Sequence, residues 1–181
     1  MSDTTVRIEP VSDRDLNRVQ RPLAGLLTSC VEAGAGIGFV LPLSLAKAER
    51  FWAGQAGALE SGSSHVWAAW QKEALVGTVT LALARQDNGG HRAEVTKLMV
   101  HPGTRRQGIA RLLLNTLENK ARALGRTLLV LDTVTGGTAE GMYARLGYRR
   151  VGVIPDFAAG ANGGFESTTV FYKRLSPVFA A

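Results

Sequence analysis

The segment from 94 to 110, EVTKLMVHPGTRRQGIA, is the part of the chain that most limits the fold. Its apolar first half predicts a strand ending at Val100, Pro102 and Gly103 predict a turn, and an amphipathic stretch from Gly108 predicts a helix. A helix that starts at such a junction turns several free backbone N–H groups toward one point, and its dipole favours an anion there. The segment therefore predicts an α/β fold with an anion-binding junction.

Apolar periodicity along the rest of the chain predicts one domain over residues 1–181, built on a mixed sheet. Apolar residues make up 45% of the 181 residues, which is enough for a substantial core. The expected strands cover 6–8, 65–70, 75–85, 93–100, 127–132, 149–154 and 168–175. The expected helices run from a Ser12 cap to the glycines after position 33 with a break at Pro22, from a Ser44 cap to Leu59, and over 108–124 and 138–146.

The basic charge of the chain is concentrated in one segment. There are 21 Lys and Arg against 15 Asp and Glu, and eight of the basic residues lie between Arg92 and Arg126, where the only acids are Glu94 and Glu118. A local positive field suggests an anionic partner, which leaves nucleic acid, a membrane surface or a phosphorylated small molecule as candidates. The ordinary alternative is a solvated helix face.

Cysteine content and the first residues suggest the compartment. The single cysteine, Cys30, excludes a disulfide framework and suits a reducing environment. The first ten residues carry acid early and have no apolar stretch typical of a signal peptide, and the longest uncharged apolar stretch is too short to span a bilayer. We therefore expect a cytoplasmic protein that does not associate with membranes.

Two motifs resemble a known family. The run Arg105-Arg106-Gln107-Gly108-Ile109-Ala110 resembles the (Gln/Arg)-x-x-Gly-x-(Gly/Ala) signature of GNAT-type N-acetyltransferases, and Ala139-x-x-Met142-Tyr143-x-x-x-Gly147-Tyr148 resembles the closing helix of that family. The order of predicted elements resembles the GNAT fold over nearly the whole chain, which implies a mixed, mostly antiparallel sheet of six to seven strands flanked by helices. The segments 34–39, 92–100 and 131–133 further resemble the tabtoxin-resistance type of acetyltransferase.

The resemblance implies acetyl-CoA as the acetyl donor and no metal. It places the pyrophosphate on the amides of the 105–110 loop and the pantetheine arm along the backbone of the strand that ends at Val100. The expected cofactor-binding residues are Leu98, Met99, Val100, Arg105, Arg106, Gln107, Gly108, Ile109 and Ala110. The resemblance also places the acceptor floor at Gly38 and Phe39. Many members have Asn where this chain has Gly136, so a side-chain contact to the pantetheine arm is lost.

Acetyl transfer to an amine needs a base and a proton donor. An alkylamine with a pKa near 10.4 is neutral in only about one part in a thousand at pH 7, so its proton has to be removed before it attacks a thioester. Glu94, in the strand that leads to the cofactor, is the first candidate base, and Asp132, at the end of the next strand, is the second. Tyr143 matches the tyrosine of the family that protonates the departing thiolate.

The leading hypothesis is direct acetyl transfer to a small-molecule amine, an amino acid or an amino-acid-like antibiotic, in which case the protein would confer resistance. The first alternative is acetylation of a protein N-terminus or lysine. The second is a nucleic-acid-binding module using the 92–126 segment, against which the absence of interleaved aromatic residues argues, so we expect no nucleic-acid partner. The sequence leaves open whether the protein forms a homodimer.

Overall fold

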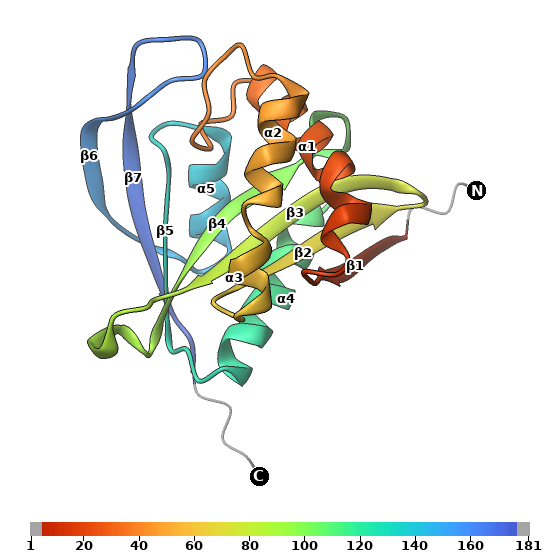
Figure 1. The fold of residues 1–181 in the computed structure, drawn as a ribbon. Coiled ribbons are helices and arrows are strands. Elements are labelled where there is room, and N and C mark those ends of the chain that lie inside the picture. The colour runs from red at the N-terminus through yellow and green to blue at the C-terminus, as the bar shows by residue number, and fades with distance from the viewer. Residues whose placement is uncertain (1–4, 177–181) are drawn as a thin grey trace.

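A seven-stranded sheet organises the chain in the computed structural model, which describes residues 5–176 (Figure 1). The strand order is β1-β2-β3-β4-β5-β7-β6, and every neighbouring pair is antiparallel except β4 and β5, which are parallel. The strands are β1 (Val6–Val11), β2 (Ser64–Gln71), β3 (Ala74–Leu83), β4 (Arg92–Val100), β5 (Leu128–Val134), β6 (Arg149–Ala159) and β7 (Phe165–Arg174). The expected mixed, mostly antiparallel sheet is therefore confirmed.

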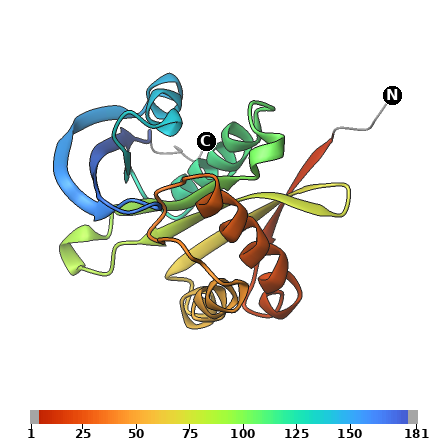
Figure 2. The ribbon, with the colours of Figure 1, turned by 90° about the horizontal axis from the view of Figure 1, so that it is seen from above.

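Helices cover both faces of the sheet (Figure 2). One face carries α1 (Leu16–Glu32), α2 (Leu45–Ala53) and α3 (Ala56–Glu60), and the other carries α4 (Ile109–Ala123) and α5 (Thr138–Arg145). Short 3-10 turns, η1 (Asp87–Gly89) and η2 (Pro102–Thr104), lie in the loops on either side of β4. Between residues 5 and 176, no helix combines the length and apolarity that crossing a membrane requires.

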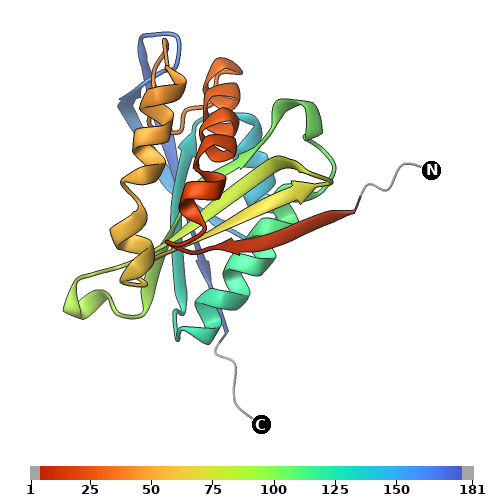
Figure 3. The ribbon, with the colours of Figure 1, turned by 45° about the vertical axis from the view of Figure 1, so that its right-hand side comes forward.

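Each face of the sheet has its own hydrophobic core. On the face of α1 and α2, which lie side by side in Figure 3, side chains such as Leu23, Leu27 and Trp52 are buried. On the opposite face, the stripe of α4 that includes Leu113 and Leu117 packs against β3 and β4, in a core that also contains Leu129 and Leu131 of β5. Successive side chains of a strand point to opposite faces of the sheet. A polar residue that follows a residue of one core therefore faces the other core.

The helical region near the N-terminus differs from its prediction. The Ser12 and Asp15 side chains hydrogen-bond each other at 2.6 Å, and the helix begins only at Leu16. It continues through Pro22, because burial of its apolar face, including Leu23 and Leu27, outweighs the hydrogen bond that the proline removes.

Other boundaries also shift. The helix expected up to Leu59 is divided into α2 and α3, while its Ser44 cap is confirmed, since Ser44 Oγ accepts from the backbone N–H of Lys47 at 3.2 Å. The strand β6 continues five residues past the predicted 149–154, and β7 starts three residues before the predicted 168–175 and ends at Arg174, because the turn between them is shorter than the glycine content suggests.

Candidate active site

The strands β4 and β5 form a fork in the sheet. They pair over only three positions, the last of which joins Glu94 to Val130, and both continue beyond it while β5 stays paired with β7 up to Val134. In Figure 1 the two strands start together at the bottom and diverge toward the top. Above Glu94, the backbone of β4 therefore has no strand partner on the β5 side, and such an edge can accept an extended ligand.

The two predicted carboxylates lie on the same face of the sheet, at the base of this fork. Ala93 and Val95 belong to the core under α4, so Glu94 points to the α1 and α2 face. Leu129 and Leu131 belong to the same α4 core, so Asp132 also points to the α1 and α2 face. The structure thus brings both candidate bases together, one on each arm of the fork.

The pKa of Glu94 is raised by its surroundings in the fork. Partial burial raises it, and the negative charge of Asp132 raises it further, against the opposing effect of Lys97 and Arg92. Asp132 itself accepts a hydrogen bond from Thr168 Oγ1 at 2.7 Å. The arrangement holds two carboxylates close enough for one to favour the protonated form of the other, which is the usual condition for a base that works near neutral pH.

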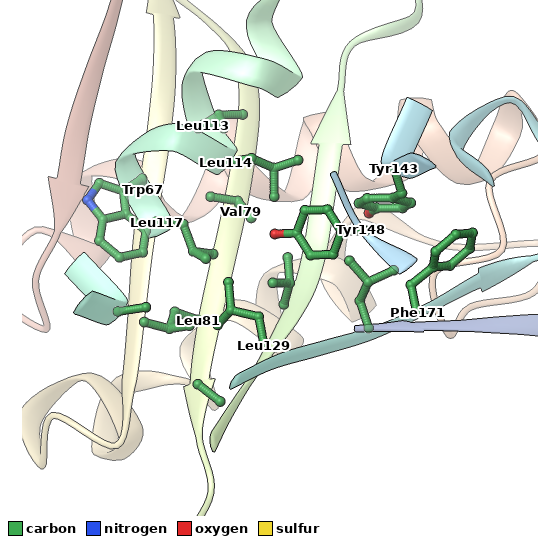
Figure 4. Close-up of a cluster of buried hydrophobic side chains, with 14 of the residues drawn as sticks. Trp67, Val79, Leu81, Leu113, Leu114, Leu117, Leu129, Tyr143, Tyr148 and Phe171 are labelled. Carbon is green, nitrogen blue, oxygen red and sulfur yellow. The ribbon is translucent and has the colours of Figure 1, made fainter. Parts of the chain in front are cut away.

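Tyr143 approaches the fork from the opposite side. It lies on α5, is 6% exposed, and packs edge-on against Tyr148 with ring centroids 5.5 Å apart and against Phe171 at 6.0 Å (Figure 4). Burial raises the pKa of Tyr143, and the charge of Asp132 raises it further, so the phenol is a proton donor at neutral pH. Tyr143 and the carboxylates can meet only through the gap between β4 and β5.

The predicted anion-binding junction lies at the start of α4. Arg106 and Gly108 adopt left-handed backbone angles, with φ of 64° and 82°, and no side chain caps the helix. Within the described residues, no backbone or side-chain acceptor receives the N–H groups of residues 106–110. Successive free amides in such a turn form a concave donor array that suits a phosphate. Residues 105–108 are all exposed.

The remaining predicted cofactor residues differ in what they can offer. The side chains of Met99 and Ile109 are 3% and 1% exposed and belong to the two cores, so only their backbone groups are accessible. Leu98 and Val100 pack against the α4 core as partly buried residues. Ala110 is partly buried on the first turn of α4. Arg105 Nε donates to the carbonyl of Val100 at 3.4 Å, and Gln107 accepts from Gln71 at 3.4 Å.

The predicted acceptor residues, Gly38 and Phe39, lie in the loop between α1 and α2. This loop crosses in front of the fork, since a side chain at Gly36 would collide with Val134 of β5, and Leu41 N–H donates to the carbonyl of Ala161 at 3.0 Å. A cavity of about 650 Å³ opens between residues 40–42 and 159–163. A second cavity, of about 280 Å³, is lined by Glu94 together with residues of β3, β5 and the η1 loop.

A buried ion-pair cluster behind the fork was not predicted. Glu118 of α4 is 5% exposed, and Lys173 of β7 donates to both of its oxygens at 2.7 and 2.8 Å. Lys173 also donates to the carbonyl of Leu146 at 2.9 Å, and Tyr148 donates its hydroxyl to Glu118 at 3.1 Å. The sequence signal for a buried charge was the position of Glu118 among the apolar residues of the α4 stripe. Its partner, Lys173, could not be identified in the same way because it lies 55 residues away.

Glu140 anchors the start of α5 next to the glycines at 136 and 137. Its carboxylate accepts from the N–H of Gly136 at 2.6 Å and from Thr169 Oγ1 at 2.9 Å. The hydrogen bond from Gly136 lowers the pKa of Glu140, followed by that from Thr169. This side chain ties the start of α5, and with it the Tyr143 helix, to β7.

The chain is similar to known proteins in sequence and, separately, in fold. The chain is 31% identical over 135 residues to an uncharacterized N-acetyltransferase of Azospirillum brasilense, covering 73% of this chain and 76% of the relative. A putative acetyltransferase of Acinetobacter baylyi has the same fold with a TM-score of 0.80 at 14% identity, over 100% of this chain and 98% of that one. A putative acetyltransferase of Salmonella typhimurium, solved with acetyl-CoA, has a TM-score of 0.74 at 17% identity, over 98% of both chains.

The family model described as the acetyltransferase (GNAT) family matches residues 39–148, which include the fork, the helix-start junction and Tyr143. The family-level prediction is therefore confirmed, and the tabtoxin-resistance type stays a prediction. Acetyl-CoA is the acetyl donor of this family, and its members are acyltransferases. The chain belongs to the GNAT family of acetyl-CoA-dependent N-acetyltransferases.

Proposed function

We propose that this enzyme transfers an acetyl group directly from acetyl-CoA to the amine of a small molecule, at the fork between β4 and β5. One observation carries the proposal: the candidate bases, Glu94 and Asp132, and the candidate acid, Tyr143, occupy opposite faces of the sheet at the only parallel strand pair in the described chain. An acceptor that enters from the α1 and α2 face then meets the acetyl group inside the gap.

The fit of acetyl-CoA is supported by two groups of free backbone atoms. The N–H groups of residues 106–110 suit the pyrophosphate, with Arg105 and Arg106 exposed beside them. The β5-facing edge of β4 from Thr96 to Met99 suits the pantetheine arm, which would pair with it as an added strand, while the carbonyl of Val100 already accepts from Arg105 Nε. Bound acetyl-CoA supplies an activated thioester, and the protein has to orient it and manage two protons.

Proton removal from the acceptor is assigned to Glu94, with Asp132 as its partner. The raised pKa of Glu94 brings the carboxylate closer to the pKa of the ammonium it serves, which strengthens it as a base. Glu94 also lines the 280 Å³ cavity, so water can reach it and carry the proton to solvent. Two carboxylates on this face additionally favour a cationic acceptor over an anionic one.

The thiolate that leaves receives its proton from Tyr143 in this proposal. Direct transfer is supported by the state of Cys30, which is 1% exposed on α1 and whose Sγ contacts the carbonyl of Val100 at 3.6 Å. Burial raises the pKa of Cys30, against the opposing effect of Arg105, so the thiolate needed for a covalent acetyl-enzyme is disfavoured. The structure therefore disfavours a covalent acetyl intermediate on Cys30.

A thiol-release assay tests the function. The protein is incubated with acetyl-CoA and a panel of primary amines, amino acids, amino-acid amides and short peptides, and released CoA is measured with DTNB. We expect CoA release that depends on a small amine, with the acetylated amine identified by mass spectrometry. Turnover restricted to the peptides would replace the small-molecule acceptor by a protein terminus, and acetyl-CoA binding with no amine-dependent release would overturn the proposed reaction.

Gly108→Val is expected to raise the dissociation constant of acetyl-CoA by at least tenfold. At φ of 82° a valine costs about 1–2 kcal/mol of backbone strain, and its side chain would project into the open space proposed for the pyrophosphate. Gly125→Val is the matched control, because Gly125 has φ of 69°, equally open surroundings and a position past the far end of α4. Calorimetric titration measures both variants; equal losses of affinity would remove the 105–110 loop from the cofactor site.

Replacing the two carboxylates separately is expected to identify the base. Activity requires an ionised Glu94, so kcat/KM should rise with pH through a midpoint above 4.5, the ordinary pKa of a glutamate, because burial and Asp132 raise that pKa. Glu94→Gln should abolish this rise and lower kcat by about 100-fold or more. Asp132→Asn should shift the midpoint toward lower pH, because it removes the charge that opposes ionisation of Glu94. Loss of the rise in Asp132→Asn, with the rise retained in Glu94→Gln, would make Asp132 the base.

A further inference from the structure

Lys97 is a half-buried cation at the fork whose ammonium group lies over two aromatic rings. Its Nζ lies over the rings of Phe51 and Phe39, 5.5 and 6.0 Å from their centroids, and 3.7 Å from the position of a Cβ built on Gly38. Within residues 5–176 no hydrogen bond or ion pair joins this Nζ to another residue. An ammonium group has three donors, and at Lys97 no residue of the described chain accepts from any of them.

An irregularity in β4 places the lysine there. Between the pairs of Thr78 with Met99 and Thr80 with Thr96, β3 advances by two residues and β4 by three, so β4 carries a bulge. Lys97 occupies it with φ of 51°, a left-handed conformation that costs a lysine about 1 kcal/mol more than a glycine. In regular alternation residue 97 would face α4, and the bulge turns it to the α1 and α2 face, where Glu94 and Asp132 lie.

The carboxylates of the fork do not neutralise this cation by contact. Burial lowers the pKa of Lys97, while the charges of Asp132 and Glu94 raise it, so the three groups face one space without an ion pair between them. One carboxylate oxygen of Asp132 instead accepts the hydrogen bond from Thr168 Oγ1. Two arginines, Arg92 and Arg85, line the cavity of about 280 Å³, and both have hydrogen-bond partners. Arg92 donates to Gln86 at 3.4 Å, and Arg85 donates to Ser63 at 3.3 Å.

We infer that Lys97 forms a subsite for a carboxylate of the acceptor, so that the acceptor is an α-amino acid or a close analogue. Its ammonium group would lie toward Glu94 and Asp132, its carboxylate would receive the Nζ donors of Lys97, and its side chain would extend past Phe39. The inference rests on the proposed acetyl transfer at the fork and narrows its substrate class. It also disfavours peptide N-termini, in which the corresponding carboxyl group is an uncharged amide.

Three matched acceptors test the subsite. L-leucine, L-leucinamide and isoamylamine share one side chain and one primary amine, and differ in having a carboxylate, an amide or nothing at the α-carbon; the same series is run for methionine and phenylalanine. kcat/KM is measured for the wild-type protein and for Lys97→Met, Lys97→Arg and Lys47→Met. Lys47 is an exposed lysine of α2, so its variant controls for loss of a surface charge. The ratio of variant to wild type for each acceptor cancels differences in amine basicity.

We expect the wild-type protein to prefer the carboxylate member of at least one series, and Lys97→Met to lower kcat/KM for that member by about 10- to 100-fold relative to its amide and amine, mainly through KM. Lys97→Arg should retain part of the preference for the acceptor that carries a carboxylate, and Lys47→Met should retain all of it. A wild-type protein that acetylates isoamylamine as well as leucine, or a preference that survives Lys97→Met in a folded variant, would overturn the subsite and leave acetyl transfer standing. Failure of every amine in the three series to stimulate CoA release would instead overturn the proposed function.

Discussion

Replacing Tyr143 by phenylalanine is expected to lower kcat by about 10²- to 10⁴-fold while leaving the affinity for acetyl-CoA nearly unchanged. The reason is that we assign the phenol as the proton donor to the departing thiolate, and the phenol is protonated at neutral pH because burial and the charge of Asp132 raise its pKa. The ring itself belongs to the core with Tyr148 and Phe171, so phenylalanine preserves the packing. Steady-state kinetics and calorimetric titration separate the two effects.

Tyr148→Phe is the matched control for this substitution. It removes the same atom from the ring that packs edge-on against Tyr143, but the Tyr148 hydroxyl donates to Glu118 instead of facing the fork. We expect Tyr148→Phe to lower the free energy of unfolding by about 1 kcal/mol and to change kcat little. Equal rates in Tyr143→Phe and the wild-type protein would remove Tyr143 from the mechanism.

Replacing Lys173 by methionine is expected to lower the free energy of unfolding by about 3–5 kcal/mol. The substitution keeps the length and apolar stem of the side chain but leaves Glu118, which is 5% exposed, without the ammonium group that contacts both of its oxygens. It also removes the donor to the carbonyl of Leu146. Arg122, at 3.6 Å from Glu118, and the Tyr148 hydroxyl do not replace a contact of this kind.

Urea unfolding measures this loss, with two companion variants. Arg174→Met, at the exposed neighbouring position of β7, should stay within about 0.5 kcal/mol of the wild-type protein. The double variant Glu118→Leu with Lys173→Met should recover much of the stability lost by Lys173→Met, because no buried charge is then left alone. A loss that is as large in the Glu118→Leu background as in the wild-type background would mean that Lys173 acts through packing alone.

Much of the fold follows from local sequence patterns. The apolar stripe of α4, the Ser44 cap and the turn after Val100 each depend on residues close in sequence, and each lies where it was predicted. The helix boundaries were predicted wrongly where burial of apolar side chains in the folded protein determines how far a helix continues. Pro22 was expected to interrupt α1, but the buried leucines around it keep that helix continuous.

The candidate site was predictable in its parts but not in its arrangement. Glu94, Asp132 and Tyr143 were identified as chemical groups, and the alternation of β4 and β5 was sufficient to place the two acids on one face. The bulge at Lys97 could not be predicted, because it is a mismatch in register between β3 and β4. The partnership of Glu118 with Lys173 likewise depends on how α4 lies against a strand that follows much later in the sequence.

The fork also divides the sheet into two halves, β1 to β4 on one side and β5 to β7 on the other. Three residue pairs between β4 and β5 join a half that carries Glu94 to a half that carries Asp132 and, through Phe171, Tyr143. Behind this hinge, the ion pair of Glu118 and Lys173 fastens α4, which packs on β3 and β4, to β7, which pairs with β5. The angle between the halves, and hence the distance across which base and acid cooperate, therefore depends on the shared core and on a salt bridge that touches neither residue.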